Sequence, residues 1–468
     1  MTKDKLIASV VCVLLFLFSL SAVVSLQLFG SWHDQQRALQ LLFLIFSALI
    51  FFVVKIDRLC KISSAILTLV FFLGFVSSFC SEYFYWSTLE YLRYVLIIVL
   101  FFVVRGAGKE PLLQYFVFWL VAVIAFILAS KSILNYIFDL LIGVDRIDIR
   151  SIYYGFDNLR FFGQFQVFCI PVIGFLYAVT RSSELKNANF IAIMLFFALM
   201  VQWAFVFALG SRGVWLALGL TMFFVFIAIK AYRAIIKLQM IAILTGFFLY
   251  FLMFNLIPDY IGSDVRVYDS LRQTSSGRVD LWYETIQVAL ENLYLGVGPM
   301  HFASIHSSIA AHPHQMILQF FVEWGLFTAI LILVLMVWGL LYSTYYVLKN
   351  KSTDHYDVTL FIAIVAALIL AQVDGVFVMP YVEVWLAVFV GLAFSRWESS
   401  EKTVISFRFK AILFPLVLFG SAFFMYALYD RFYEGDKGFY ISQSYENILD
   451  YKKPRFWRQG YIPMTPIE

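Results

Sequence analysis

Charged residues are scarce in this chain, because Asp, Glu, Lys and Arg together make up only 14% of its 468 residues. A soluble globular protein carries about 25%, so the scarcity excludes an ordinary soluble fold. Hydrophobic residues account instead for 62% of the chain and aromatic residues for 19%. The net charge of +4 is small and gives no reason to expect a nucleic-acid partner. The composition predicts an all-α polytopic integral membrane protein in a lipid bilayer.

Cysteine is also scarce, and its four occurrences lie within or beside apolar segments without forming a C-x-x-C pair. This pattern argues against a disulfide framework and against a zinc site. A nucleotide-binding loop is not expected, because Gly296-Val297-Gly298 is too short for a P-loop or a dinucleotide fingerprint. The sequence contains no internal repeat and no soluble segment large enough to fold alone.

Long apolar runs take up most of the chain. A helix needs about 20 apolar residues to cross the hydrocarbon, and by that measure we expect about 12–13 transmembrane helices. They form a single transmembrane domain over residues 1–429. The first run is longer than the apolar core of a signal peptide, so we expect it to be retained. The expected spans are Leu6–Leu28, Ala38–Val54, Ile62–Cys80, Trp86–Val104, Leu112–Ala129, Phe161–Val179, Phe190–Leu209, Val214–Ile229, Leu238–Ile257, Leu326–Leu348, Val358–Val378, Tyr381–Phe394 and Ala411–Tyr429.

Lysine and arginine recur in alternate short connections between these spans. The positive-inside rule places those connections, and with them the N-terminus, in the cytoplasm. An odd number of spans then places three longer segments on the outer side. They are the loop 131–160, the loop 258–325 with its short helices, and the C-terminal tail 430–468.

Two arginines occupy positions that suit phosphate. Arg212 lies in the very short turn Gly210–Gly213 between two spans, where a fixed guanidinium can grip two phosphate oxygens. An arginine that merely snorkels to the membrane surface is the alternative. Arg278 precedes an expected helix, whose N-terminal N–H groups would add to its charge. Its alternative is an ion pair with Asp280 or Glu284 on a solvated face.

His312-Pro313-His314-Gln315 leads into another expected helix, which carries Glu323. Histidine exchanges protons near neutral pH, so either histidine is a candidate base. A metal site of the His-x-His kind is an alternative, but no carboxylate or cysteine completes an obvious ligand set. Ordinary structural hydrogen bonding is the other alternative.

Several further polar residues are candidate supports on the same side of the membrane. Arg150 and Arg160 belong to the loop 131–160, and Asp374 lies near the end of a late span. Arg93 lies inside a span with Glu90 one turn earlier. A charge at membrane depth is a functional candidate, although an intrahelical ion pair is the simpler interpretation.

Together these residues resemble the bacterial O-antigen ligases and their relatives, the O-antigen polymerases and the O-linked oligosaccharyltransferases. The resemblance covers mainly residues 190–348. In that family an asparagine usually follows the histidine, where this chain has another amide, Gln315. The matching elements are the Gly-Ser-Arg212-Gly turn, Ser-Gly-Arg278 before Leu-Trp, the Gly296-Val297-Gly298 turn, His314-x-x-x-Leu318 and Glu323-x-Gly325.

The resemblance implies a GT-C-like membrane glycosyltransferase in the bacterial inner membrane, with its active site facing the periplasm. Such an enzyme needs no metal or other cofactor and moves a glycan from undecaprenyl diphosphate to an acceptor hydroxyl. Lipid A core is the expected acceptor, with a growing polysaccharide or a protein Ser/Thr as alternatives. Arg212 and Arg278 would hold the diphosphate, and His314 would assist the acceptor. The expected supports are His312, Gln315, Glu323, Arg150, Arg160 and Asp374.

A flippase or other transporter of lipid-linked glycans is the alternative from another class. Transporters typically show repeats, broken helices and charges near the membrane midplane. Here the polar residues cluster instead beyond the ends of the spans, which favours an enzyme. Attack opposite the leaving group predicts inversion at the anomeric carbon.

Overall fold

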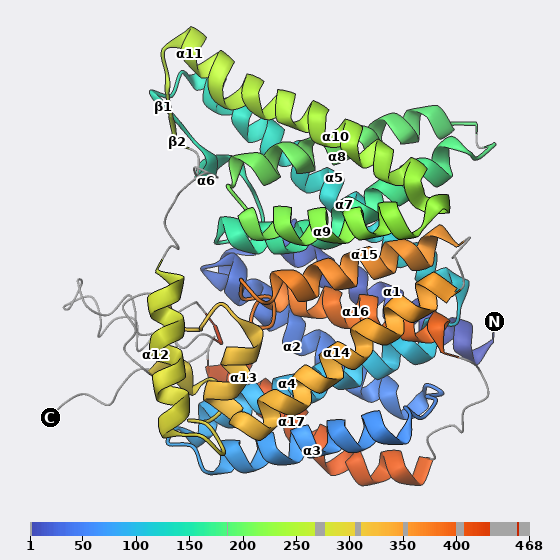
Figure 1. Cartoon of the computed structure of the whole chain (residues 1–468), viewed down its shortest axis with the longest axis vertical. Coiled ribbons are helices and arrows are strands. Elements are labelled where there is room, and N and C mark those ends of the chain that lie inside the picture. The colour runs from blue at the N-terminus through green and yellow to red at the C-terminus, as the bar shows by residue number, and fades with distance from the viewer. Residues whose placement is uncertain are drawn as a thin grey trace, which may run out of the picture.

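The computed structural model of the chain describes residues 2–184, 186–266, 277–304, 310–349, 354–398, 407–430 and 456–457. Over these residues the protein is a bundle of long helices with short elements gathered at one end (Figure 1). Helix α12 (Arg278–Glu291) crosses that end, which we call the α12 end. The N-terminus lies at the opposite end (Figure 1).

Among the described residues, thirteen long helices build the bundle, and each overlaps one of the expected spans. Nine helical segments of the described chain are long and apolar enough to cross a membrane, and shorter apolar helices accompany them. The expectation of an all-α polytopic membrane protein is thereby confirmed. The long helices are α1 (Lys3–Ser19), α2 (Trp32–Val53), α3 (Lys61–Phe79), α4 (Phe84–Ala107), α5 (Pro111–Ile142), α7 (Leu159–Arg181), α8 (Ala188–Ala208), α9 (Arg212–Ala228), α10 (Arg233–Phe251), α14 (Leu326–Lys349), α15 (His355–Leu370), α16 (Pro380–Trp397) and α17 (Phe407–Tyr429).

The remaining elements are short. Strands β1 (Arg146–Asp148) and β2 (Asp264–Arg266) pair in parallel. Residues 267–276 and 305–309 of the loop 258–325 lie outside the described residues, as does most of the tail 430–468. The short helices are α6 (Ile149–Ile152), α11 (Ile257–Ile261) and α13 (Met316–Trp324), and the short turns and π-helical segment are Leu20–Ala22, Gln27–Phe29, Lys230–Tyr232, Leu252–Leu256 and His301–Ser304.

Some helix boundaries differ from the expected ones. Helix α1 ends at Ser19, well before Leu28, because the chain tightens into a 3₁₀ turn at Leu20–Ala22. Helix α5 continues past Ala129 to Ile142 and takes the first part of the expected loop 131–160 into the membrane helix. That continuation is mostly apolar, although it contains Lys131, Asn135 and Asp139. It stops where Gly143 adopts φ +66° as a left-handed cap.

Close backbone approach holds the bundle together at several helix crossings. Lipid tails are as apolar as leucine, so helices associate in a membrane through tight packing of small residues. At the α16–α4 crossing, a Cβ added at Gly391 would lie 2.9 Å from the side chain of Val104. At the α10–α8 crossing, a Cβ at Gly246 would lie 2.7 Å from Trp203.

Helices α12 and α13 form a small unit with an apolar cluster of its own, at Leu281, Ala289, Phe302 and Val322. The turn at Gly296 fits tightly against α13, since a Cβ there would lie 2.5 Å from the Glu323 carbonyl carbon. The Ser77 hydroxyl of α3 donates to the Glu323 carbonyl at 3.0 Å. The bundle therefore fixes the unit that carries both Arg278 and His314.

Candidate functional site

A cavity of about 310 Å³ opens at the α12 end. Residues from the first turns of helices α7, α9 and α12 line it. Each of these turns contributes one arginine to the lining: Arg160 from α7, Arg212 from α9 and Arg278 from α12. Asp374, from the connection between α15 and α16, is the one acidic residue among the described lining residues. The cavity therefore has a surplus of positive charge.

The helix ends themselves add to this surplus. The N-terminus of a helix carries partial positive charge on N–H groups that have no partner within the helix. The Asn158 side chain accepts from the Arg160 N–H at 2.9 Å and so caps α7. Gly277, which precedes α12 with φ +73°, has no side chain with which to cap. Three arginines and three helix N-termini make a site suited to a multivalent anion.

Arg278 shows how strongly these groups act on one another. Burial lowers the pKa of its guanidinium, the Asp374 carboxylate raises it, and Arg160 and Arg212 lower it further. Its Nε is buried and has no hydrogen-bond partner among the described residues. An anion in the cavity would offset the mutual repulsion of the arginines and could accept that hydrogen bond.

His314 lies beside the cavity, with its Nδ1 atom 3.5 Å from Oδ1 of Asp374. Burial lowers the pKa of His314, Asp374 raises it, and Arg160 and Arg278 lower it, so the net shift is downward. Burial alone would raise the pKa of Asp374, but His314, Arg160 and the Gly375 N–H together hold it below its usual range. A carboxylate that faces Nδ1 favours the tautomer in which Nδ1 keeps its proton, so Nε2 is the basic nitrogen.

The backbone at His314 is unusual, because its φ of +54° lies in the left-handed region. Such a conformation costs of order 1–3 kcal/mol for a residue other than glycine and tends to occur at functional sites. The His314 N–H donates to Nδ1 of His312 at 3.3 Å, and the two rings lie 4.0 Å apart between centroids. His312 is only 1% exposed, so its ring lies in the interior, where it contacts His314.

Hydrogen bonds from three helices hold this segment in place. The Trp282 indole of α12 donates to the Pro313 carbonyl at 3.0 Å. The Gln315 side chain caps α13 at the Leu318 N–H, and its amide donates to Gln372 after α15 at 3.0 Å. The Met316 N–H donates to the Ala371 carbonyl at 2.9 Å. Gln315 is therefore a helix cap that ties α13 to α15.

The structure separates two of the expected supports from the cavity. Arg150 is exposed on α6 and is not part of the lining that the described residues form. Glu323 is buried, 1% exposed, at the far end of α13. Arg160 and Asp374, in contrast, lie in the lining together with Arg212 and Arg278.

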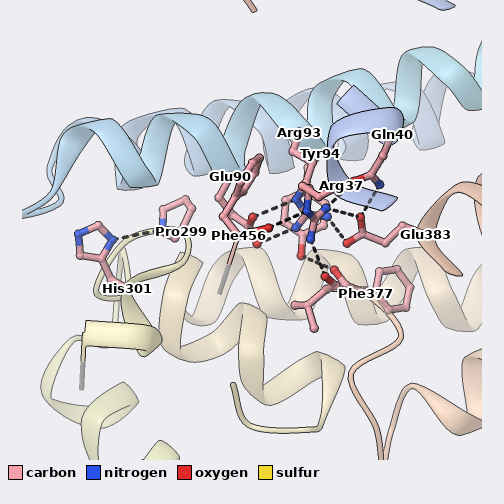
Figure 2. A network of polar contacts seen from close by, with 11 residues as sticks. Arg37, Gln40, Glu90, Arg93, Tyr94, Pro299, His301, Phe377, Glu383 and Phe456 are labelled. Atoms are coloured by element: carbon pink, nitrogen blue, oxygen red, sulfur yellow. Dashed lines mark hydrogen bonds and ion pairs between the residues drawn. The ribbon is translucent and has the colours of Figure 1, made fainter. Parts of the chain in front are cut away.

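A second polar cluster lies inside the bundle, where the sequence predicted only the Glu90–Arg93 pair. That pair is present, with Nη2 of Arg93 2.6 Å from Oε1 of Glu90. Arg93 also forms an ion pair with Glu383 of α16, and Glu383 accepts from Arg37 and Gln40 of α2 (Figure 2). The run of polar residues at 33–37, followed by Gln40, was the sequence signal for this buried network.

Comparison with known proteins identifies the domain to which most of these residues belong. Residues 195–333 match the family model described as O-antigen ligase. The match contains Arg212, Arg278 and His314, whereas Arg160 and Asp374 lie outside it. The search of curated proteins found no match. The chain is therefore a polytopic membrane protein in which residues 195–333 match the O-antigen ligase family, whose members are membrane glycosyltransferases.

Proposed function

We propose that the protein is an O-antigen ligase that moves a glycan from undecaprenyl diphosphate to a hydroxyl of lipid A core. The observation that carries this proposal is the cavity in which Arg160, Arg212 and Arg278 converge at helix N-termini beside the His314–Asp374 pair. This arrangement supplies what transfer from a diphosphate needs: fixed positive charge for the leaving group and a base for the acceptor.

In the proposed reaction the acceptor oxygen attacks the anomeric carbon while Nε2 of His314 takes the hydroxyl proton. The bond between that carbon and the diphosphate oxygen breaks, and its electron pair leaves with the diphosphate. The arginines and helix N-termini stabilise the charge that develops there, so the mechanism needs no metal. Asp374 stabilises the imidazolium that forms, and attack from the opposite face inverts the anomeric carbon.

The position of the basic residues supports an orientation with the cavity on the periplasmic side. Lys55 lies 3.9 Å from Asp4, close to the N-terminus, and Lys109 lies 2.5 Å from Asp57. These connections therefore lie at the end opposite the cavity. The positive-inside rule would place that end in the cytoplasm, and the cavity in the periplasm of a bacterial inner membrane.

A reconstituted transfer assay tests the proposal and separates the acceptors. The full chain in liposomes receives an undecaprenyl-diphosphate glycan with lipid A core, with a second lipid-linked glycan, or with a Ser/Thr-containing protein. We expect transfer to lipid A core, undiminished by chelator, with an inverted linkage. Transfer only to one of the other acceptors would reassign the enzyme to a polymerase or to a protein transferase. Movement of the donor across the membrane without any transfer would reassign it to a flippase.

A further inference from the structure

The connection between α15 and α16 carries Asp374 near its start and is held further along by residues of other helices. Nη2 of Arg37 donates to the Val378 carbonyl at 2.7 Å. The Tyr94 hydroxyl donates to the Phe377 carbonyl at 3.1 Å. The Val378 N–H donates in turn to the Gly375 carbonyl at 3.1 Å. The backbone beside Asp374 is therefore tied to α2 and α4.

The connection between α15 and α16 also contacts the ring of His312. A Cβ added at Gly375 would lie 2.5 Å from Cε1 of His312, so the backbone there is in close contact with the ring. His312 in turn accepts from the His314 N–H. A continuous series of contacts thus runs from Arg37, through the connection, to both members of the His314–Asp374 pair.

Arg37 is held rigidly in the buried network. It is 1% exposed, and its Nη1 lies 3.2 Å from Oε2 of Glu383. Gln40 donates to the same carboxylate oxygen at 2.7 Å, and Arg93 pairs with the other oxygen (Figure 2). A guanidinium has five N–H donors in a fixed plane. In Arg37 these donors reach acceptors on separate segments of the chain.

A further partner of Arg37 comes from the C-terminal part of the chain. Nε of Arg37 donates to the Phe456 carbonyl at 2.9 Å, and the guanidinium carbon lies 4.9 Å from the centre of the Phe456 ring (Figure 2). Phe456 is 1% exposed and Trp457 is 4% exposed. These two residues are therefore packed inside the bundle, against the network that holds the Asp374 connection.

We propose that Arg37 is a positioning residue for glycan transfer, and that the docked residues Phe456 and Trp457 complete the support on which it acts. This inference rests on the proposed function. One guanidinium, that of Arg37, donates to the Phe456 carbonyl, to Glu383 and to the Val378 carbonyl. Because Val378 belongs to the same connection as Asp374, these bonds fix the position of Asp374 beside His314. Lysine, a single flexible ammonium, cannot reproduce these directed hydrogen bonds.

Kinetics of the full chain provide the first test. Arg37→Lys lowers kcat by about 10²-fold, the cost of a misplaced catalytic group, and leaves the KM for the donor unchanged because the arginines of the cavity are untouched. Phe456→Ala lowers kcat in the same way but less. In an Asp374→Asn background, Arg37→Lys adds little, since both changes act through the same carboxylate. Fully additive losses, or a loss confined to KM, overturn the proposal.

Arg105→Lys is the matched control. Arg105 is also buried, at 3% exposure, and it also joins a backbone carbonyl, that of Asp57 at 2.9 Å, to a glutamate, Glu398. It lies at the opposite end of the bundle. We expect its replacement to lower stability without changing kcat in the folded protein. An equal fall in kcat would show that any buried arginine matters equally.

Hydrogen exchange gives a readout that does not depend on activity. Amides in peptides that contain Phe377–Val378 and Phe456–Trp457 should exchange faster in Arg37→Lys than in the unaltered chain, and should be unaffected in Arg105→Lys. Unchanged exchange in both peptides overturns the docking, whatever the kinetics show. Absence of transfer by the unaltered chain would instead refute the proposed function and leave the exchange result to decide the docking.

Discussion

Two clusters of charged residues in this protein differ in the balance between positive and negative charge. The cavity at the α12 end gathers three arginines around one aspartate in its described lining. The network inside the bundle sets two arginines, Arg37 and Arg93, against two glutamates, Glu90 and Glu383. The cavity is open to a ligand, whereas the network is buried, with all four side chains at most 4% exposed.

This difference in charge balance suggests different roles for the two clusters: the cavity is suited to binding a ligand, and the network is suited to holding the helices in place. A buried charge must be paired, because an unpaired one costs several kcal/mol, so a balanced network is already satisfied and has nothing to offer a ligand. A surplus of one sign at an open site remains unsatisfied until a counter-charge arrives. The surplus in the cavity therefore supports our proposal of an anion site there, and the balanced network fits the supporting role that we propose for Arg37.

The largest effect on transfer is expected from replacing His314, the proposed base. His314→Ala should lower kcat by about 10²- to 10⁴-fold, the range for loss of a general base, while donor binding persists. Transfer kinetics with reconstituted protein measure this. His312→Ala tests whether the neighbouring ring is instead the base: a larger loss there than at His314 would exchange the two roles.

The next largest effect is expected from replacing an arginine of the cavity, which tests the role of its surplus positive charge. Arg278→Lys should lower transfer by about 10²-fold, as for loss of one group that stabilises developing charge, because an ammonium cannot grip two oxygens at once. Arg181→Lys, at the opposite end of α7 from Arg160, is the control and should transfer normally. Equal activity of the two variants would argue against the diphosphate site.

Removing one charge from the balanced network should act mainly on stability. Glu383→Gln leaves two buried arginines facing one glutamate, and breaking a buried pair in this way costs about 3–5 kcal/mol. We expect a clear fall in the unfolding temperature in detergent. Lys109→Ala breaks the more exposed pair with Asp57 and should cost less than about 1 kcal/mol. Similar falls in both variants would contradict the difference between the buried network and the exposed pair.

The smallest expected effect is a shift in pH dependence. Among the described charged groups that act on His314, Asp374 raises the pKa of the ring, and Arg160 and Arg278 lower it. Asp374→Asn removes the raising influence, so the pKa falls. Because a base must be neutral, the acidic limb of the pH–rate profile should move to lower pH. Asp357→Asn, at the other end of α15, should leave the limb in place, and a shift upward in Asp374→Asn would refute this electrostatic assignment.

Much of the fold was predictable from hydropathy, because a helix in lipid satisfies its own backbone hydrogen bonds and needs only enough apolar length. The boundaries were less predictable. Helix α5 runs on through residues 131–142, whereas the expected span stopped at Ala129, just before Lys131. The positions of Arg278 and His314 near helix starts were also predicted, and both are confirmed.

The partners of these residues were not predictable. Arg160 and Asp374 were only two of several candidates in the sequence, and their place in one lining with Arg212 and Arg278 follows from how α7, α9, α12 and α15 pack. Arg37 gave no signal of its own beyond lying in a polar run, since its partners Val378, Glu383 and Phe456 are hundreds of residues away.

The sequence by itself determined that this is a helical membrane protein, and it located the motifs of the O-antigen ligase domain, because apolar length and short motifs are local properties. Only the tertiary structure decided which charges meet. It brought three helix N-termini to one cavity, placed Asp374 beside His314, and balanced Arg37 and Arg93 with Glu90 and Glu383. Charge balance is a property of neighbours in space, and helix packing chooses those neighbours.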